Sequence, residues 1–296
     1  MRVTVLGAGT MGHGIAQVSA MAGHDVFLRD IEDDLVTDGI EGIRDNLAEG
    51  VERDKVTEAE MEATLDRITG TTDLQAAVSD ADLVIEAVPE DMDLKQSIFE
   101  DVEAAAPEDT LIASNTSSLS ITEMASVLER PDRVIGLHFF NPPHLMDLVE
   151  VVVAEQTSDD TEARAVEYVE GIDKDPVVIR DTAGFATSRL GLALGLEAIR
   201  MVEQGVASPA DIDAAMRKGY SYPMGPIELG DHVGLDVRLH IAEYLREELG
   251  ERFKPPQALR RKVRAGNLGK KSGEGFYVWE NGEKVGMSGD WGDAER

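Results

Sequence analysis

The sequence lacks cysteine altogether and is poor in lysine, in aromatic residues and in long apolar runs. Without cysteine, the chain of 296 residues can form no disulfide, no thiolate nucleophile and no Cys-ligated zinc or iron site, and we expect no metal. No stretch approaches the roughly 20 apolar residues of a membrane-spanning helix, and the N-terminus has no signal-peptide layout. We therefore expect a cytoplasmic protein that does not bind membranes.

Negative charge dominates the composition, with 58 acidic residues against 28 basic ones and a net charge of −30. This charge disfavours nucleic acid and anionic membranes as partners. Only nine of the basic residues are lysine, and a carboxylate-rich, lysine-poor surface suits molar salt, where a Debye length of about 3 Å screens self-repulsion. We therefore expect a halophilic protein that is destabilised in dilute buffer. The alternative is an acidic protein from an ordinary cell.

Apolar patterns divide the chain into two predicted domains. The first alternates short β-branched runs with helical stretches, which is typical of a parallel sheet with crossover helices. The second has apolar residues at helical spacing. We predict an α/β fold, with a Rossmann-type doubly wound, mostly parallel sheet in residues 1–182 and an all-helical C-terminal domain in residues 183–296. The expected strands are 2–7, 25–30, 81–88, 110–114, 133–140, 148–154 and 175–181.

Two further expectations concern local structure. One long helical region should end near Asp66, before the third expected strand. The polar, glycine-rich residues from about Asn281 onward should be loosely held.

Three glycines, Gly7, Gly9 and Gly12, follow the first expected strand and open the first expected helix. Gly7 permits a tight turn, Gly9 lets the backbone approach a pyrophosphate, and Gly12 lets helix and strand pack closely. The helix N-terminus then offers N–H groups and partial positive charge to phosphates. A glycine-rich turn can also serve packing alone, but its place at the start of a βαβ unit favours dinucleotide binding.

Asp30 ends the second expected strand, 18 residues after Gly12. A carboxylate there can accept hydrogen bonds from both ribose hydroxyls of the adenosine and repels a 2′-phosphate, so we expect NAD as the cofactor rather than NADP. Two alternatives stay open at this position. The neighbouring Arg29 could bind a 2′-phosphate, and Asp30 could instead cap a helix.

Several separated motifs resemble those of L-3-hydroxyacyl-CoA dehydrogenases, including 3-hydroxybutyryl-CoA dehydrogenases. They are SNTSSLSITEM, HFFNPPHLMDLVEV, DTAGF, EQGVASPADIDAAMRKGYSYPMGPIELGD and LGKKSGEGFY. The resemblance covers nearly the whole chain in the family's order. It implies oxidation of an L-3-hydroxyacyl-CoA to the 3-ketoacyl-CoA with reduction of NAD, as in fatty-acid β-oxidation, or the reverse reaction. It also implies that the helical domain completes the cleft for the acyl-CoA substrate and forms a homodimer.

The resemblance also implies catalytic residues. Removing a hydride from C3 of a secondary alcohol needs a base for the hydroxyl proton, and His138, near the end of a core strand, suits that task among six histidines. Glu150 corresponds to the carboxylate that orients this imidazole, although it could be an edge-strand acid facing water. Ser117 corresponds to a serine that binds the hydroxyl and the ketone, whereas by pattern alone Ser118 and Ser120 are equal candidates.

Four further residues are expected near the cofactor or the substrate. Glu90 and Lys95 match residues close to the nicotinamide end of the cofactor, although charges at this spacing also occur at surfaces. Asn141 and Ser188 are expected to contact the substrate, and Ser188 stands where the family has an active-site asparagine, which leaves substrate selectivity open. The region around residues 53–55 is strongly acidic, so we predict no CoA-binding residue.

Two alternative functions remain at this point. A related dehydrogenase could act on a free 3-hydroxy acid such as L-gulonate, or the chain could bind NAD without catalysis. The combination of His138, Glu150 and Ser117 argues against the second alternative, because a binding module needs no proton acceptor.

Overall fold

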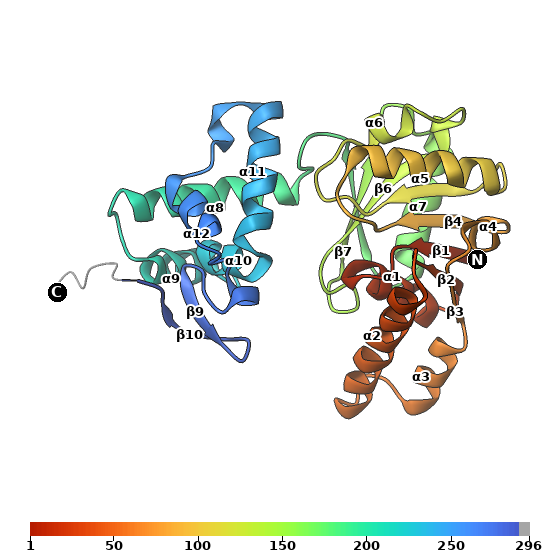
Figure 1. Cartoon of the computed structure of the whole chain (residues 1–296), viewed down its shortest axis with the longest axis horizontal. Helices are drawn as coiled ribbons and strands as arrows, with labels where there is room; N and C mark the ends of the chain where they lie inside the picture. The colour runs from red at the N-terminus through yellow and green to blue at the C-terminus, as the bar shows by residue number, and fades with distance from the viewer. Residues whose placement is uncertain (290–296) are drawn as a thin grey trace. The chain divides into compact units, whose positions relative to one another are not determined.

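The computed structural model describes residues 1–289 and divides into two compact units, Met1–Thr182 and a second that begins at Ala183 (Figure 1). Each unit has a hydrophobic core of its own. No helix in this described part is both long and apolar enough to cross a membrane.

An eight-stranded sheet with flanking helices forms the first unit (Figure 1). The strands lie in the order β3-β2-β1-β4-β5-β6-β7-β8, and all neighbours are parallel except β6 and β7. The predicted doubly wound, mostly parallel sheet is therefore confirmed. Its strands are β1 Arg2–Leu6, β2 Asp25–Arg29, β3 Ile68–Thr71, β4 Leu83–Glu86, β5 Leu111–Ser114, β6 Val134–Phe139, β7 Leu148–Val153 and β8 Asp175–Arg180.

Seven α-helices connect these strands. They are α1 Thr10–Met21, α2 Asp33–Glu52, α3 Glu58–Leu65, α4 Leu74–Val78, α5 Met92–Ala105, α6 Ile121–Ala125 and α7 Asp159–Gly171, with a short 3₁₀ helix, η1, at Pro131–Arg133. The helical region expected up to about Asp66 consists of two helices, α2 and α3, and ends at Leu65. Asp54 adopts a left-handed conformation after α2, and Thr57 starts α3 with a capping box to Glu60. Local capping thus divides the region into two helices.

The central strands are buried on both faces, which explains their continuous apolar runs. Every residue of β4 and of β6 is buried. Two of these residues are ionisable, Glu86 at the end of β4 and His138 near the end of β6. Ionisable groups are stable inside a sheet only when they are hydrogen-bonded. Glu86 and His138 therefore need polar partners close to the edge where β4 and β6 end.

One strand of the sheet, β3, is absent from the sequence-based prediction. Its four residues, ITGT, are exposed or only partly buried and lie at the edge beside β2. Packing explains the glycine in this strand, because a Cβ on Gly70 would lie 2.5 Å from Val36 Cγ1 in α2. The strand is therefore defined by its neighbours rather than by an apolar pattern of its own.

The second unit is mainly helical, as expected. Its helices are α8 Thr187–Glu203, α9 Pro209–Tyr220, α10 Pro226–Val233, α11 Leu235–Leu249 and α12 Gln257–Arg264, with 3₁₀ turns η2 Glu251–Phe253 and η3 Lys270–Ser272. Their apolar faces meet in one core that includes Leu192, Leu245 and Phe276.

A β-hairpin ends the described part of this unit, with β9 at Tyr277–Glu280 and β10 at Glu283–Met287. The expectation that the chain is loosely held from Asn281 is therefore wrong up to residue 289, and residues 290–296 lie outside the described part. Buried Asp231 fastens the hairpin by accepting hydrogen bonds from Phe276 N (2.9 Å), Tyr277 N (2.8 Å) and Trp279 Nε1 (3.1 Å). Burial raises the pKa of Asp231, and these hydrogen bonds oppose that rise.

Candidate active site

Three glycines shape the turn between β1 and α1. Backbone atoms pack closely against Gly7 and Gly12, whereas the space beside Gly9 is open. Gly7 has a φ of +102°, and a Cβ there would lie 2.6 Å from Ala87 O. A Cβ on Gly12 would lie 1.7 Å from Gly7 O, so helix and strand can approach only without a side chain. A Cβ on Gly9, by contrast, would meet nothing within 4 Å. The turn therefore fits a pyrophosphate, because the open side at Gly9 adjoins the N-terminus of α1.

Asp30 lies directly after β2 and is tied to the same turn. Its Oδ2 accepts a hydrogen bond from Ala8 N at 2.6 Å, and its Oδ1 accepts one from Ile31 N at 2.7 Å. The residue does not cap a helix, because Glu32 occupies the N-cap of α2. Each carboxylate oxygen keeps a further lone pair, so the arrangement fits two ribose hydroxyls.

Arg29 and Asp30 have different partners. Arg29 Nε donates a hydrogen bond to Thr72 O at 3.2 Å, on the chain just after β3. One nitrogen of the guanidinium is therefore engaged beside the edge strand, whereas the carboxylate of Asp30 bonds the glycine-rich turn.

His138 and Glu150 face each other across two antiparallel strands. The register of β6 and β7 pairs them directly, which places both side chains on the same face of the sheet. His138 Nδ1 lies 2.7 Å from Glu150 Oε2, and the two residues are 5% and 0% exposed. The interpretation of Glu150 as an edge-strand acid facing water is wrong, because β8 pairs with β7 on its outer side and Glu150 is fully buried.

This pairing determines what the imidazole can do. A carboxylate beside Nδ1 accepts the proton on that nitrogen, which leaves the lone pair on Nε2 as a base. After protonation, the negative charge of Glu150 stabilises the imidazolium. The pair is therefore suited to take a proton from a neutral hydroxyl and to return it.

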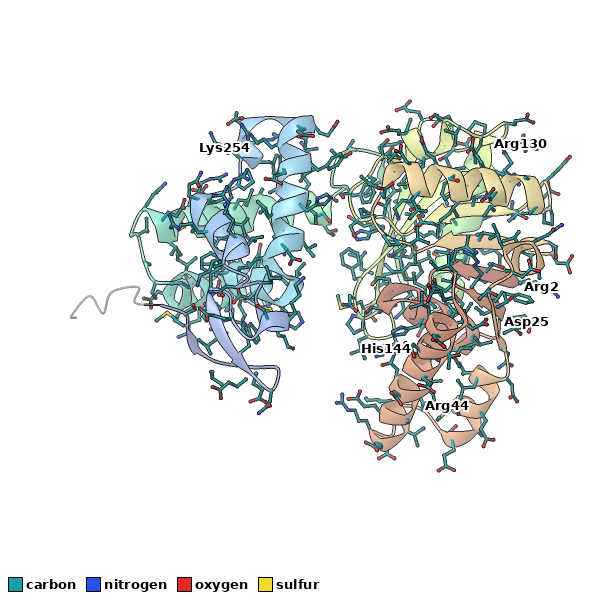
Figure 2. All side chains as sticks on the ribbon, in the orientation of Figure 1. Arg2, Asp25, Arg44, Arg130, His144 and Lys254 are labelled. Atoms are coloured by element: carbon teal, nitrogen blue, oxygen red, sulfur yellow. The ribbon has the colours of Figure 1, made fainter. Side chains whose placement is uncertain are left out.

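The other histidines have different surroundings. In residues 1–289, His138 is the one histidine that pairs with a carboxylate side chain. Burial lowers the pKa of His13, in the first turn of α1, and of His144, in the loop between β6 and β7 (Figure 2). Both imidazoles are therefore mainly neutral near pH 7, and neither forms an ion pair with a carboxylate in residues 1–289.

In the polar turn after β5, the three candidate serines have different hydrogen-bond partners. Ser120 Oγ accepts a hydrogen bond from Glu123 N and caps α6, while Ser118 Oγ donates to Glu90 Oε1 at 3.3 Å. Ser117 donates its backbone N–H to the same oxygen at 3.2 Å. Among the residues that the structure describes, no group bonds the Ser117 hydroxyl, which is therefore available to a ligand.

Glu90 and Lys95 belong to a largely buried network rather than to a surface pair. Lys95 is 1% exposed, and its Nζ lies 2.7 Å from Glu86 Oε1 and 3.3 Å from Glu90 Oε2. Glu90 then accepts a hydrogen bond from Thr116 Oγ1 at 2.6 Å. The network thus joins the turn that carries Ser117 to the end of β4 and to the start of α5.

Neither Glu86 nor Asn115 is among the predicted site residues. Glu86 is fully buried, and Asn115 Oδ1 accepts a hydrogen bond from Phe139 N at 2.9 Å, which joins the Ser117 turn to the residue after His138. An acid at the end of the apolar run LVIE is the signal that could have indicated Glu86. Asn115 lies in an already recognised motif, but its partner is 24 residues away and leaves no local pattern.

Two predicted substrate residues lie apart from these contacts. Asn141 is exposed in the loop that follows β6. Ser188 is partly buried in the first turn of α8, in the second unit. The structure therefore brings together His138 with Glu150 and Ser117 with Glu90 and Lys95.

A dinucleotide cradle and a histidine–carboxylate pair along one sheet edge are the features of an NAD-dependent oxidoreductase of the Rossmann type. Comparison with known proteins defines the class further. Residues 2–182 match the family model described as "3-hydroxyacyl-CoA dehydrogenase, NAD binding domain", and residues 184–279 match the model of its C-terminal domain. The chain therefore belongs to the 3-hydroxyacyl-CoA dehydrogenase family, and the resemblance seen in its motifs is confirmed.

Individual relatives agree with this assignment. The chain is 43% identical to a probable 3-hydroxybutyryl-CoA dehydrogenase of Bacillus subtilis, over 94% of this chain and 97% of that protein. It is 42% identical to the mitochondrial hydroxyacyl-coenzyme A dehydrogenase of Sus scrofa, over 94% and 91%. The crystal structure of M. tuberculosis FadB2 superposes with a TM-score of 0.92 at 44% identity, over 94% and 99%.

Replacing Asp30 with alanine should narrow the preference for NAD over NADP. The change removes two acceptors for ribose hydroxyls, which weakens NAD binding, and removes the repulsion of a 2′-phosphate. Titration of both cofactors against the wild type and Asp30→Ala measures the two dissociation constants. Arg29→Ala is the matched control, and it should leave their ratio unchanged. A wild type that already prefers NADP would contradict this account of Asp30.

Proposed function

We propose that the protein oxidises an L-3-hydroxyacyl-CoA to the 3-ketoacyl-CoA with NAD⁺, reversibly, as a β-oxidation enzyme does. The observation that carries this proposal is the buried His138–Glu150 pair at the end of β6, on the sheet edge where the dinucleotide cradle also lies. Family membership supports the thioester substrate, since the relatives carry names of hydroxyacyl-CoA and hydroxybutyryl-CoA dehydrogenases.

In this mechanism, each residue has one task. The glycine-rich turn and Asp30 would hold NAD⁺, which would supply the acceptor for the hydride of C3. His138 Nε2 takes the proton of the C3 hydroxyl, so that loss of a hydride and a proton converts the alcohol to a ketone. Glu150 keeps the imidazole oriented and stabilises its protonated form. The Ser117 hydroxyl can donate to the ketone oxygen and accept from the alcohol, so it serves both oxidation states.

A substrate panel tests the proposal directly. NADH formation is followed at 340 nm, in molar KCl, with L-3-hydroxybutyryl-CoA, with longer thioesters, with free 3-hydroxybutyrate and with L-gulonate. Turnover of the thioesters alone supports the proposal. Turnover of L-gulonate alone would assign the chain to the free-acid alternative, and NAD binding without turnover would make it a binding protein.

The second unit has the features of a dimerisation surface, and we propose a homodimer in which this unit also completes the substrate cleft. Its exposed apolar side chains include Leu190, Val206 and Tyr220, which are 72%, 58% and 72% exposed. Burial of such side chains stabilises association because it removes apolar surface from water.

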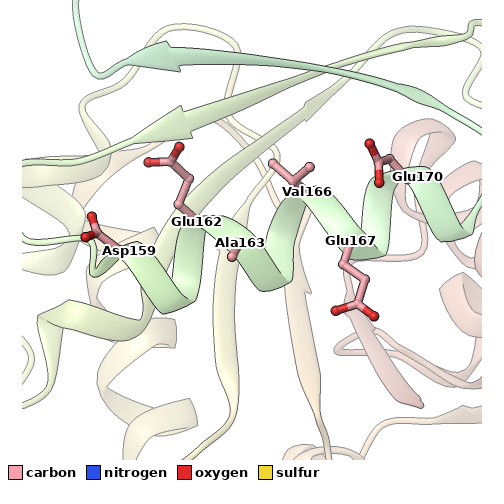
Figure 3. Close-up of a pocket in the computed structure, with 6 residues that line it drawn as sticks. All are labelled: Asp159, Glu162, Ala163, Val166, Glu167 and Glu170. Carbon is pink, nitrogen blue, oxygen red and sulfur yellow. The ribbon is translucent and has the colours of Figure 1, made fainter.

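We also propose that the protein works in the cytoplasm of a halophilic cell. Carboxylates crowd its surface, for example on α7, where Asp159, Glu162, Glu167 and Glu170 line one shallow depression (Figure 3). Basic side chains at the surface lie among acids, as Arg130 does in its ion pair with Asp132 (Figure 2). Repulsion among unpaired carboxylates is thus the dominant surface interaction in dilute buffer.

His138→Gln should lower turnover by roughly 10²- to 10⁴-fold, the usual contribution of a general base. NADH binding should remain intact, because the dinucleotide cradle lies on other strands. His240→Gln is the matched control, since this histidine is exposed on α11. Stopped-flow turnover and fluorescence titration of NADH separate the two effects. Turnover near the wild-type value would remove His138 from the mechanism.

Ser188→Asn should raise kcat/KM for short L-3-hydroxyacyl-CoA substrates by a few-fold to about a hundred-fold. An amide reaches further from the backbone than a hydroxyl and carries both a donor and an acceptor, and one added hydrogen bond in the transition state contributes roughly 0.5–3 kcal/mol. A C4 to C16 thioester series measures the effect. A loss of activity confined to bulky acyl groups would mean that Ser188 makes room for them, and identical profiles would mean that position 188 is silent.

Thermal stability should rise as KCl increases from dilute to molar concentration. Salt screens the repulsion among the carboxylates that give the chain its net charge of −30. Calorimetry across a KCl series measures the melting temperature. A Glu167→Lys, Glu170→Lys double variant, with both changes at exposed positions of α7, should show a weaker salt dependence. A wild-type melting temperature that stays flat or falls would contradict the halophilic assignment.

A further inference from the structure

Glu86, Lys95 and Glu90 form a chain of charges where β4 and β5 end. Lys95 Nζ donates to Glu86 Oε1 at 2.7 Å and to Val88 O at 3.3 Å, and it lies 3.3 Å from Glu90 Oε2. Glu86 is 0% exposed and Lys95 is 1% exposed, whereas the side chain of Glu90 is 30% exposed. We call these three residues the charge triad.

Each hydrogen bond to the two carboxylates of the triad comes from a donor. Glu86 Oε1 accepts from Val88 N at 2.7 Å as well as from Lys95, and Glu86 Oε2 accepts from Ser114 Oγ at 2.6 Å. Glu90 Oε1 accepts from the hydroxyl of Thr116 at 2.6 Å. At their formal charges, two carboxylates and one ammonium give the triad one net negative charge.

Sheet topology gives the triad its place relative to a dinucleotide. The chain winds from β1 toward β3 in one direction and from β4 toward β6 in the other, so the switch point lies between β1 and β4. Asp30 marks the adenosine half at the end of β2, which leaves the edge of β4 to β6 for the other half. The packing of Ala87 O against Gly7 brings the loop after β4 next to the glycine-rich turn.

We propose that the charge triad shifts the relative affinity of this site toward NAD⁺ and away from NADH. The nicotinamide ring carries a positive charge when oxidised and none when reduced, so a fixed negative charge nearby stabilises the oxidised form selectively. Salt screens a buried charge much less than an exposed one, so this shift persists in molar KCl. This inference rests on the proposed function for the placement of NAD, but it concerns cofactor binding and not the acyl substrate.

Glutamine substitutions test the role of the charge. Glu86→Gln and Glu90→Gln each remove one negative charge and keep the shape of the side chain. Both variants should raise the ratio of the NAD⁺ to the NADH dissociation constant by about 3- to 30-fold. NADH fluorescence titration and calorimetric titration of NAD⁺, both in molar KCl without acyl substrate, measure the two constants.

Ser114→Ala is the matched control. It removes the hydroxyl that donates to Glu86 but changes no charge, so it should alter both dissociation constants by the same factor and leave their ratio unchanged. A merely structural role for Glu86 would give the same pattern in Glu86→Gln. If Glu86→Gln does not fold, Glu90→Gln carries the test, because its side chain is partly exposed.

The outcomes separate this inference from the proposed function. An unchanged ratio in the glutamine variants, or an equal shift in Ser114→Ala, overturns the role of the triad even if the wild type oxidises thioesters. A raised ratio of the NAD⁺ to the NADH dissociation constant in the glutamine variants supports the role of the triad. This holds even if the thioesters prove inactive, because no substrate is present in the titrations.

Discussion

The reversal of direction between β6 and β7 is the constraint on which the site depends. The strands from β1 to β6 all run the same way, so a further parallel strand would begin at the opposite edge of the sheet. Because β7 returns antiparallel, its first residues lie at the edge where β6 ends, and Glu150 meets His138 in register. The parallel strand β8 then pairs with the outer side of β7, so that β7 is not an edge strand, and Glu150 is fully buried.

Buried charges link the site to the stability of the fold. Glu86 and Glu150 are each 0% exposed, and a carboxylate in such surroundings is tolerated only with a full set of partners. Removing one member of a buried ion pair typically costs about 3–5 kcal/mol, because the other charge remains unpaired. The contacts of these buried acids and their neighbours therefore also hold the ends of β4, β5 and β6 together, so substitutions there affect the stability of the fold as well as the candidate site.

Sequence patterns predict those parts of the structure that are determined by residues close together in the chain. The glycine-rich turn, the Asp30 position and the buried strands all have periodic or motif signals, and the predicted sheet is confirmed. The edge strand β3 and the hairpin at Tyr277 have none, since the first takes its form from α2 and the second from Asp231, 46 residues earlier in the chain. Glu86 has one local signal, an acid at the end of an apolar run, but its partners come from three separate parts of the chain and cannot be predicted from that signal.

Gly9 differs from its two neighbouring glycines in a way that has a practical consequence. A side chain at Gly7 or Gly12 would strike backbone within the fold itself, whereas a methyl group at Gly9 would enter empty space from an ordinary backbone conformation, with φ −65° and ψ −170°. A single carbon atom at this position thus occupies the approach of the pyrophosphate without disturbing the protein. Folding and cofactor occupancy, which a side chain at Gly7 or Gly12 would disturb together, can be separated at residue 9.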